Sequence, residues 1–386
     1  MTSPRIDLDY LTRTLADLIR INSVNPSLVA GAPGEAEAAG YVLEALRGLG
    51  LDVRLAEAAP GRPSAIGVLR GTGGGRCLML NGHLDTVSLD AMPNALVPEI
   101  RGGRIYGRGS YDMKGGVVAC LAGVKALVDA GLALRGDLVV AAVADEEYAS
   151  IGTAQVASQV EVDGAIVTEP TGLDLCLAHK GFVWLEVETL GRAAHGSRFQ
   201  EGIDANLRMG RVLSELERLE ASLRNGRSHR LVGPASLHAA LLSGGTELST
   251  YAARCTVKIE RRTIPGETLP QVEGEVQAIL DRLRAADSSF SARRRTLLER
   301  QPFEVSPEAP LVQAIRRAAG AHLGRPPASM GVAYWMDTAI LAAAGVEAAA
   351  IGPAGAGAHA AEEWVDLQSV ADVAAILAAT AVDYCG

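Results

Sequence analysis

The sequence holds few cysteines, and they form neither a disulfide framework nor a thiolate metal motif. The five are Cys77, Cys120, Cys176, Cys255 and Cys385. Their number is odd, their spacing is wide, and most of them lie in apolar segments. We therefore expect reduced core cysteines in a cytoplasmic protein.

Long hydrophobic runs and an excess of positive charge are also missing. No uninterrupted apolar stretch reaches the length of about 18 residues that would predict a membrane span. Residues 1–21 lack the basic-then-apolar order of a signal peptide, and their apolar positions have helical spacing. Lys and Arg number 36 against 45 Asp and Glu, which gives a net charge of −9. Because an acidic chain does not attract phosphate backbones, we expect neither nucleic acid nor a membrane as a partner.

Apolar sequence, by contrast, is abundant. It makes up 48% of the 386 residues, and the mean hydropathy is +0.16. A chain of this length exceeds the size of one ordinary hydrophobic core, so we expect two domains. Helical patterns at 7–21, 35–50 and 115–130 alternate with short apolar runs. This alternation predicts an α/β fold, with a mainly parallel mixed sheet covered on both faces by helices.

The pattern changes near residue 180. Residues 180–299 alternate as strand, helix, two strands, helix and strand. This βαββαβ order describes a ferredoxin-like α+β domain with an antiparallel sheet. Helical periodicity then returns at 309–323. We therefore predict a first domain of residues 1–179 and 300–386, interrupted by a second domain of residues 180–299.

Acidic residues and histidines follow several of the apolar runs. They are His83-Leu84-Asp85, Asp112, Asp145-Glu146-Glu147, Glu169 and His359. In parallel sheets ligands gather beyond the carboxyl ends of the strands, so these distant residues can converge. Buried carboxylates are costly unless they are paired or bound to metal. Imidazoles and carboxylates without thiolates suit hard-to-borderline divalent ions, and the pattern indicates a binuclear metal centre.

Each motif alone also has an ordinary interpretation. His83 and Asp85 face the same way on an extended segment, so Asp85 could orient a metal-binding His83 or could be a solvated strand-end acid. The glycine-rich loop 107–116 could cradle a phosphate. However, Asp112 within it favours a cation, and the Walker lysine pattern is missing. Residues 145–147 could form an exposed acidic turn.

In combination, HLD, GRGSYDMKGG, DEE, EP and GAHAAEEW resemble the motifs of the M20 metallopeptidase family in order and spacing. The resemblance extends from about residue 10 to about residue 380. It implies a zinc-peptidase-like catalytic domain with an inserted lid. It also implies hydrolysis of an amide bond, first the deacylation of an N-acyl amino acid as in acetylornithine deacetylases. A metal-dependent carboxypeptidase or dipeptidase is the alternative within the family.

The resemblance also implies roles for the strand-end residues. One metal would be held by His83, Asp112 and Glu169, and the other by Asp112, Glu147 and His359. Asp112 would bridge the two ions, and its peptide bond to Met113 would be cis. Glu146 would be the general base, and Asp85 the partner of His83. The ions would be zinc, with cobalt or manganese as alternatives, and would activate a shared water.

Two lid residues complete the implied site. His195 in GRAAHGS would stabilise the oxyanion, commonly from the partner subunit of a homodimer formed through the lid. Arg262 in RRTIPGE would bind the α-carboxylate of the substrate. The ordinary alternatives are a surface-loop histidine and a strand-end arginine. Two departures bear on the identity of the substrate: Arg261 stands where relatives often have Asp, and no asparagine follows Gly244-Gly245.

Two other classes of function fit the sequence less well. A non-catalytic binding protein of the same fold would be expected to lack a ligand or the base Glu146, and all of them are present. A nucleotide-binding α/β protein would use residues 107–116, where the acid opposes a phosphate. The leading hypothesis is therefore a dinuclear amidohydrolase acting on a small N-acyl amino acid or dipeptide.

Overall fold

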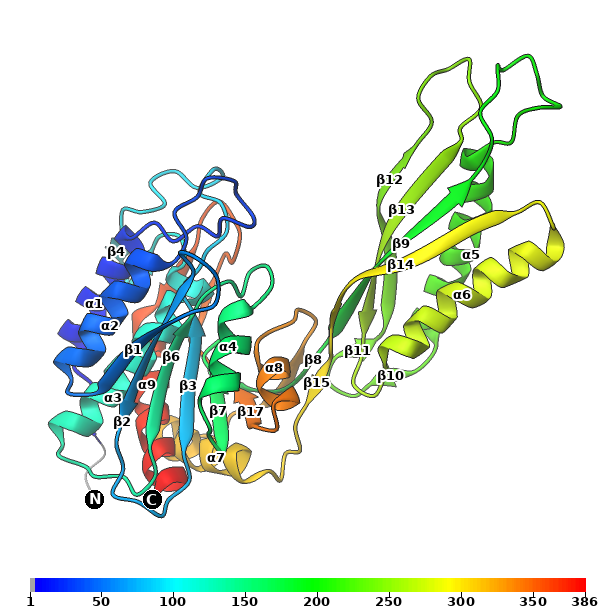
Figure 1. Cartoon of the computed structure of the whole chain (residues 1–386). Helices are drawn as coiled ribbons and strands as arrows, with labels where there is room; N and C mark the ends of the chain where they lie inside the picture. The colour runs from blue at the N-terminus through cyan, green and yellow to red at the C-terminus, as the bar shows by residue number, and fades with distance from the viewer. Residues whose placement is uncertain (1–3) are drawn as a thin grey trace. The chain divides into compact units, whose positions relative to one another are not determined.

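The computed structural model describes residues 4–386, and the chain divides into two compact units. Unit 1 comprises Met1–Leu177, Val305–Met330 and Met336–Gly386, and unit 2 comprises Ala178–Glu304 and Gly331–Trp335. Both units mix helices with strands (Figure 1).

Unit 1 is built on a mixed sheet whose strand order is β1-β2-β6-β3-β7-β17-β8. Its strands are β1 (Asp52–Glu57), β2 (Pro63–Leu69), β3 (Leu78–His83), β6 (Leu138–Val143), β7 (Gly164–Val167), β17 (Glu347–Ala350) and β8 (Leu175–His179), with β16 (Ser329–Val332) also paired to β8. The strands are mostly apolar, and every residue of β3, β6 and β7 is buried.

The parallel strands occupy the centre of this sheet. β6, β3, β7 and β17 run parallel to one another, whereas β1, β2 and β8 pair antiparallel. The sheet is therefore more evenly mixed than the expected mainly parallel one. At one edge the reason is local, because β1 and β2 are consecutive strands joined by the short turn 58–62.

Helices cover both faces of the sheet, as the alternating pattern predicted. A Cβ at Gly82 of β3 would lie 3.0 Å from Val117 of α3 (Gly115–Asp129), so Gly82 faces that helix. Its neighbour Asn81 donates to Thr153 of α4 (Ile151–Gln159) on the opposite face. The other helices of unit 1 are α1 (Leu8–Arg20), α2 (Ala36–Gly48), α7 (Pro310–Leu323), α8 (Thr338–Ala343) and α9 (Leu367–Cys385).

The helix α9 is both long and apolar. By length and composition it could cross a membrane, but 61% of its apolar window is buried inside the protein. It packs against α3 and α7, and the Asp366 carboxylate caps its first turn by accepting the N–H of Ser369. Within residues 4–386, α9 therefore serves as a core helix of unit 1.

A small second sheet, which the sequence did not predict, has the order β18-β19-β5-β4. Its strands are β4 (Glu99–Arg101), β5 (Arg104–Tyr106), β18 (Gly355–Ala356) and β19 (Trp364–Asp366). β19 contacts the short turn η1 (Ser110–Lys114), which precedes α3. This sheet joins the glycine-rich loop to the segment that contains His359.

Unit 2 contains an antiparallel sheet of order β12-β13-β9-β14. Its main elements in chain order are β9 (Gly181–Leu190), α5 (Ala205–Asn225), β12 (Ser236–Gly244), β13 (Arg254–Thr263), α6 (Leu269–Ala286) and β14 (Ser291–Arg300), with the short strands β10 (Ser228–His229), β11 (Gly233–Pro234) and β15 (Phe303–Glu304). This is the βαββαβ arrangement that the sequence predicted. The inner sheet face and the two long helices share one apolar core.

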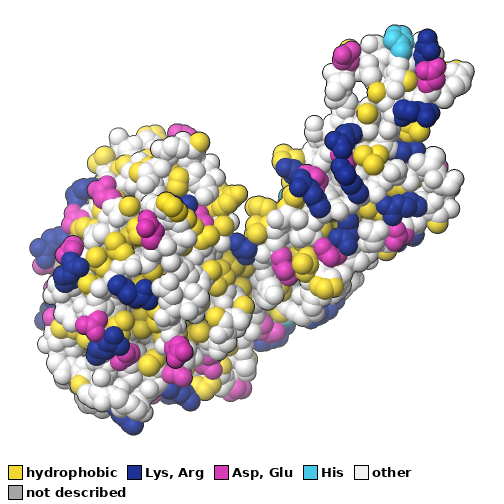
Figure 2. Space-filling view, in the orientation of Figure 1, with side chains coloured by type: hydrophobic (Ala, Val, Ile, Leu, Met, Phe, Trp, Pro, Cys, Tyr) yellow, Lys and Arg dark blue, Asp and Glu magenta, His cyan; other side chains and the backbone are white. Residues whose placement is uncertain are grey.

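The opposite face of this sheet carries charged side chains in rows. Arg254 and Arg293 flank Glu188, and Arg295 pairs with Glu186. Figure 2 shows Lys and Arg side chains gathered over the strands of unit 2. Opposite charges across neighbouring strands stabilise the register of the sheet.

Candidate metal centre

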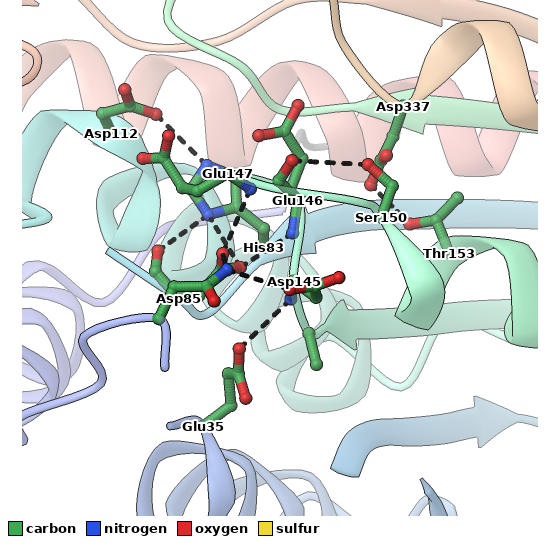
Figure 3. A network of polar contacts seen from close by, with 12 residues as sticks. Glu35, His83, Asp85, Asp112, Asp145, Glu146, Glu147, Ser150, Thr153 and Asp337 are labelled. Atoms are coloured by element: carbon green, nitrogen blue, oxygen red, sulfur yellow. Dashed lines mark hydrogen bonds and ion pairs between the residues drawn. The ribbon is translucent and has the colours of Figure 1, made fainter. Parts of the chain in front are cut away.

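The candidate donors lie at the carboxyl ends of the parallel strands and in the loops that follow them. They are His83 at the end of β3, Glu146 and Glu147 after β6, Glu169 after β7, His359 after β17, and Asp112 in η1 before α3. This is the edge of the sheet where the sequence predicted that ligands would gather. Figure 3 shows several of these side chains converging from separate elements.

Asp112 lies between the two imidazoles. Its Oδ1 is 3.2 Å from Nε2 of His83, and its Oδ2 is 3.3 Å from Nε2 of His359. Nε2 of His83 is also 3.8 Å from Oε1 of Glu169, and Nε2 of His359 is 3.0 Å from Oε2 of Glu147. Each imidazole therefore neighbours Asp112 and one glutamate, as two adjacent sites that share a carboxylate require.

The donor atoms are close enough to meet single ions. Two triads have one donor atom per residue with all three atoms within 4.8 Å: His83, Asp112 and Glu147, and His83, Glu146 and Glu169. These triads divide the residues differently from the sets implied by the resemblance. Glu146, expected to be a base rather than a ligand, lies inside the same cluster.

Burial dominates the electrostatics of the three glutamates. Desolvation raises the pKa of Glu146, Glu147 and Glu169, and the neighbouring negative charges raise it further. Asp112 differs because hydrogen bonds from His359 and His83 outweigh the effect of burial and lower its pKa. Asp112 and Glu147 in turn stabilise the charged form of the His359 imidazole and raise its pKa to about 10. Positive charge is thus strongly favoured among these carboxylates.

The donor set suits divalent ions of the zinc, manganese or cobalt type. It offers imidazole nitrogens and carboxylate oxygens, and the five cysteines are free and take no part in the cluster. Three of the carboxylates have pKa values raised by burial, so a cation would relieve a cost that the protein otherwise carries. The residues present therefore fit the metal centre that the sequence indicated.

Asp85 supports the cluster from behind. Nδ1 of His83 donates to the backbone oxygen of Asp85 at 2.9 Å and lies 3.5 Å from the carboxylate Oδ1. The nearer acceptor is thus the carbonyl, whereas the sequence analysis expected the carboxylate. The carboxylate instead accepts the backbone N–H groups of Glu146 and Glu147, at 3.0 and 3.1 Å. With Nδ1 engaged by this carbonyl, Nε2 is the nitrogen of His83 that faces Asp112 and would bind a metal.

Glu363 holds the glycine-rich loop in a comparable way. Its carboxylate accepts the backbone N–H groups of Gly109, Tyr111 and Asp112 at 2.9 to 3.1 Å. The same carboxylate pairs with Arg108, whose guanidinium also donates to the backbone oxygen of Ala360, next to His359. One buried ion pair therefore fixes both the loop that carries Asp112 and the loop that carries His359. The Asp112–Met113 peptide bond is cis, as the resemblance implied.

Several buried polar residues around the donors received no role from the sequence. They are Asn25, Glu35, Arg62, Arg108, Asp337 and Glu363. The only sequence signal for Glu363 is its place in the motif that contains His359. The hydrogen-bond partners of Arg108 and Glu363 lie more than 250 positions away in the chain, so no local pattern reveals them.

Lys114 excludes the phosphate-cradle interpretation of the glycine-rich loop. The lysine is buried, and its Nζ donates to the backbone oxygens of Leu18 and Ile21 at the end of α1. Burial lowers its pKa to about 7. The one lysine of this loop therefore ties it to α1 and does not face a ligand.

The two remaining predicted residues, His195 and Arg262, belong to unit 2. Nδ1 of His195, an exposed histidine, lies 2.8 Å from Oγ of Ser197 and accepts the backbone N–H of Ser197 at 3.2 Å. Arg262 lies on β13, donates from Nε to Glu260 at 2.7 Å, and has its guanidinium over the ring of Phe182.

Arg261, one of the two departures from the family pattern, has a structural role. Its side chain is fully buried and forms ion pairs with Glu267 and Glu275. It also donates to the backbone oxygen of Arg262. The positive charge at this position is therefore neutralised within unit 2.

We expect Glu363→Gln to weaken metal binding roughly 10- to 100-fold, the usual effect of losing a partner that orients ligands. The NH₂ group of the glutamine would face backbone N–H groups or the Arg108 guanidinium, which are donors as well. The loop that carries Asp112 would therefore lose its fixed position. Competition with a chromophoric chelator measures the affinity for Co²⁺ or Zn²⁺.

The neighbouring Glu362→Gln provides a matched control. The Glu362 side chain is 67% exposed, whereas that of Glu363 is 1% exposed. Glu362→Gln should leave metal affinity at the wild-type value. Equal affinities for both variants would contradict the role assigned to Glu363.

Asp337 predicts a pH dependence of stability. Burial raises its pKa to about 6 from an ordinary 3.8, although a hydrogen bond from Thr153 at 2.5 Å opposes the shift. The folded protein therefore binds this proton more tightly than the unfolded chain, and the stabilisation is lost as pH rises through about 6. Relative to wild type, chelator-treated Asp337→Asn should gain roughly 2 kcal/mol of stability as pH rises from about 4 to about 7, because the wild-type loss falls between the ordinary pKa of 3.8 and the folded pKa of about 6. A melting-temperature difference that stays constant with pH would contradict this.

The chain is similar to known proteins in sequence and in fold. The model of the peptidase family M20/M25/M40 matches residues 79–383. A Bacillus subtilis (strain 168) N-formyl-4-amino-5-aminomethyl-2-methylpyrimidine deformylase is 28% identical over 269 residues, which cover 64% of this chain and 62% of that protein. An acetylornithine deacetylase of Salmonella paratyphi B is 30% identical over 288 residues, covering 70% and 72%. The chain thus matches less than two thirds of the deformylase.

Solved structures share the fold of the whole chain. The aminopeptidase PepT from Bacillus cereus has a TM-score of 0.83 at 16% identity, covering 99% of this chain and 100% of that one. An M20 family metallo-carboxypeptidase from Sulfolobus solfataricus has a TM-score of 0.78 at 17% identity, covering 97% and 99%. With the family match over most of its length and the donor cluster at the strand ends, the chain belongs to the peptidase family M20/M25/M40.

Proposed function

We propose that this protein hydrolyses the amide bond of an N-acyl amino acid at a centre of two divalent ions. The observation that carries the proposal is the position of Asp112, whose two oxygens face the imidazoles of His83 and His359. The sequence relatives, a deformylase and acetylornithine deacetylases, remove an acyl group from nitrogen. Both support deacylation.

The proposed ligands are those implied by the family resemblance. One ion would be held by His83, Asp112 and Glu169, and the other by Asp112, Glu147 and His359. Zinc fits this set, and cobalt or manganese could replace it. Such a pair of ions would lower the pKa of a shared water and polarise the scissile carbonyl.

Glu146 is the proposed general base. Asp85 fixes its backbone N–H, and its side chain belongs to the donor cluster. In this role Glu146 accepts the proton of the attacking water and delivers it to the leaving nitrogen. The same residue thus serves as base in the first step and as acid in the second.

Unit 1 would be the catalytic domain and unit 2 the lid. We propose that His195 donates its Nε2 proton to the oxyanion from the partner subunit of a homodimer, and that Arg262 binds the substrate carboxylate. The contacts of His195 with Ser197 support the first role, because both engage Nδ1 and leave Nε2 for the oxyanion. The exposed Leu241 and Leu242 on the edge strand β12 support a dimer formed through the lid.

The alternative to deacylation is a carboxypeptidase or dipeptidase, which would hydrolyse a peptide bond by the same metal-dependent chemistry. The peptidases among the similar structures are 16–18% identical and share the fold alone, so they do not favour peptide substrates. A non-catalytic binding role has no support from the residues, because the proposed ligands and base are all present. Five free cysteines agree with a reducing compartment such as the cytoplasm.

A hydrolysis screen of the zinc- or cobalt-loaded protein with N-acetyl, N-formyl and N-succinyl amino acids and dipeptides tests the function. We expect turnover of at least one N-acyl amino acid, and its loss on exhaustive chelation. Glu146→Gln should lower kcat about 10²- to 10⁴-fold, because proton transfer fails, with metal content unchanged.

Tyr148→Phe is the control for this substitution, since Tyr148 lies in the same loop and is exposed. It should retain activity. Nearly full hydrolysis by metal-loaded Glu146→Gln would refute the assignment of the base.

The role of His195 in a partner's site is tested by mixing subunits. His195→Ala alone should lose about 10²- to 10³-fold in kcat, as expected for an oxyanion donor. In mixed dimers with Glu146→Gln, the subunit with an intact Glu146 would receive His195 from its partner. Equal mixing should therefore restore roughly a quarter of wild-type activity, because half of the dimers would hold one intact site. A mixture no more active than its components would exclude action in trans.

A further inference from the structure

A chain of buried polar side chains lies behind the donor cluster and reaches none of the proposed ions directly. It runs from Glu35 to Arg62, Asp145, Asn25 and Asp85. Each of the five residues is less than 10% exposed. In the view of Figure 3, Asp85 and Asp145 lie below His83, and Glu35 lies below both of them. Such a network is costly unless each polar group in it has a hydrogen-bond partner.

Asn25 is the link between the two aspartates. Its Nδ2 donates to Oδ2 of Asp85 at 2.8 Å and to Oδ1 of Asp145 at 3.0 Å. Its Oδ1 accepts the backbone N–H of Ser27 at 2.8 Å. The backbone N–H of Asn25 donates to the oxygen of Thr86 at 2.9 Å. All polar groups of the side chain are engaged, and the two carboxylates determine which end of the amide carries nitrogen.

Both aspartates act on the loop that holds the proposed base. Asp85 accepts the backbone N–H groups of Glu146 and Glu147. Asp145 directly precedes Glu146 and has a left-handed backbone with a φ of 70°. Its own N–H donates to Glu35 at 3.2 Å. The amide of Asn25 therefore connects two anchors of one short turn.

The charges explain why an amide, and no ion, occupies this position. Arg62 forms ion pairs with Glu35 and Asp145. A second cation beside Asp85 would cancel negative charge that favours divalent ions in the neighbouring cluster. A carboxylate there would repel both aspartates. A neutral donor of two hydrogen bonds satisfies both carboxylates without either cost.

We propose that Asn25 is a positioning residue for the hydrolytic centre proposed above: its amide sets the separation of Asp85 and Asp145 and so holds Glu146 and Glu147 in place. The inference rests on the proposed function for its effect on turnover, but its effect on metal binding is independent of any substrate. Small displacements of reacting groups cost rate steeply, about 10²-fold for roughly 1 Å.

Three substitutions of Asn25 test the proposal. Asn25→Asp keeps the shape and replaces the donor with a charged acceptor, Asn25→Leu keeps the approximate size without a donor, and Asn25→Ser is a milder change that can reach only one aspartate. The control is Asn22→Asp, which adds the same charge three residues away. Asn22 caps only the backbone N–H of Val24 and lies outside the network.

The measurements are Co²⁺ affinity by chelator competition, the Co²⁺ absorption spectrum, and kcat and KM for the substrate found in the screen. We expect Asn25→Asp and Asn25→Leu to weaken at least one Co²⁺ site about 10- to 100-fold and to alter its spectrum. We also expect kcat to fall about as far, with KM within about twofold. Asn25→Ser should give an intermediate loss, and Asn22→Asp should match wild type.

A purely structural role would lower the melting temperature but leave the Co²⁺ affinity, the spectrum and the kcat of the folded protein unchanged. Wild-type values of these in a folded Asn25→Asp or Asn25→Leu variant would overturn the proposal, and Asn25→Ser decides the matter if the other two do not fold. If the wild-type protein hydrolyses none of the amides, the proposed function fails, whereas Co²⁺ affinity still decides the role of Asn25.

Discussion

The cost of holding like charges together out of water is the constraint on which unit 1 depends. Burial and mutual repulsion raise the pKa of Glu146, Glu147 and Glu169, and Asp112 stays ionised only through its contacts with the two imidazoles. Such a cluster favours unfolding unless positive charge compensates it. The repulsion among these buried carboxylates therefore both favours the binding of cations and lowers the stability of the fold.

The same arrangement of a buried carboxylate and backbone N–H groups holds two of the loops in this cluster. Asp85 and Glu363 are buried carboxylates that are not among the proposed metal ligands, and each accepts two or three backbone N–H groups from a loop that presents ligands. A carboxylate holds a loop more firmly than a neutral acceptor would, because charged hydrogen bonds are stronger. Each carboxylate has its own compensation: Arg108 pairs with Glu363, and the amide of Asn25 donates to Asp85. The ligand geometry therefore depends on residues outside the ligand set.

The sequence predicted the proposed ligands but not what holds them. Acids and histidines that end apolar runs are visible locally, and sheet geometry explains why they converge, so the cluster from His83 to His359 could be anticipated. Asn25, Arg62 and Glu363 were missed because their partners lie about 60 to 255 positions away. The antiparallel pairing of β17 with β8 and that of β19 with β5 in the small sheet were missed for the same reason, since pairing between remote short strands leaves no periodic signal. In unit 2 the alternation of long elements sufficed, whereas the roles of His195 and Arg262 remain predictions.

The position of β17 between β7 and β8 has a consequence for biosynthesis. β7 and β8 precede unit 2 in the chain, and β17 follows it. On the ribosome, the nascent chain therefore exposes an unpaired edge of β7 until the whole inserted unit has been translated. Open edges of this kind invite aggregation. Unit 2 has an apolar core of its own. Early folding of this inserted unit would shorten the time for which the edge of β7 is exposed.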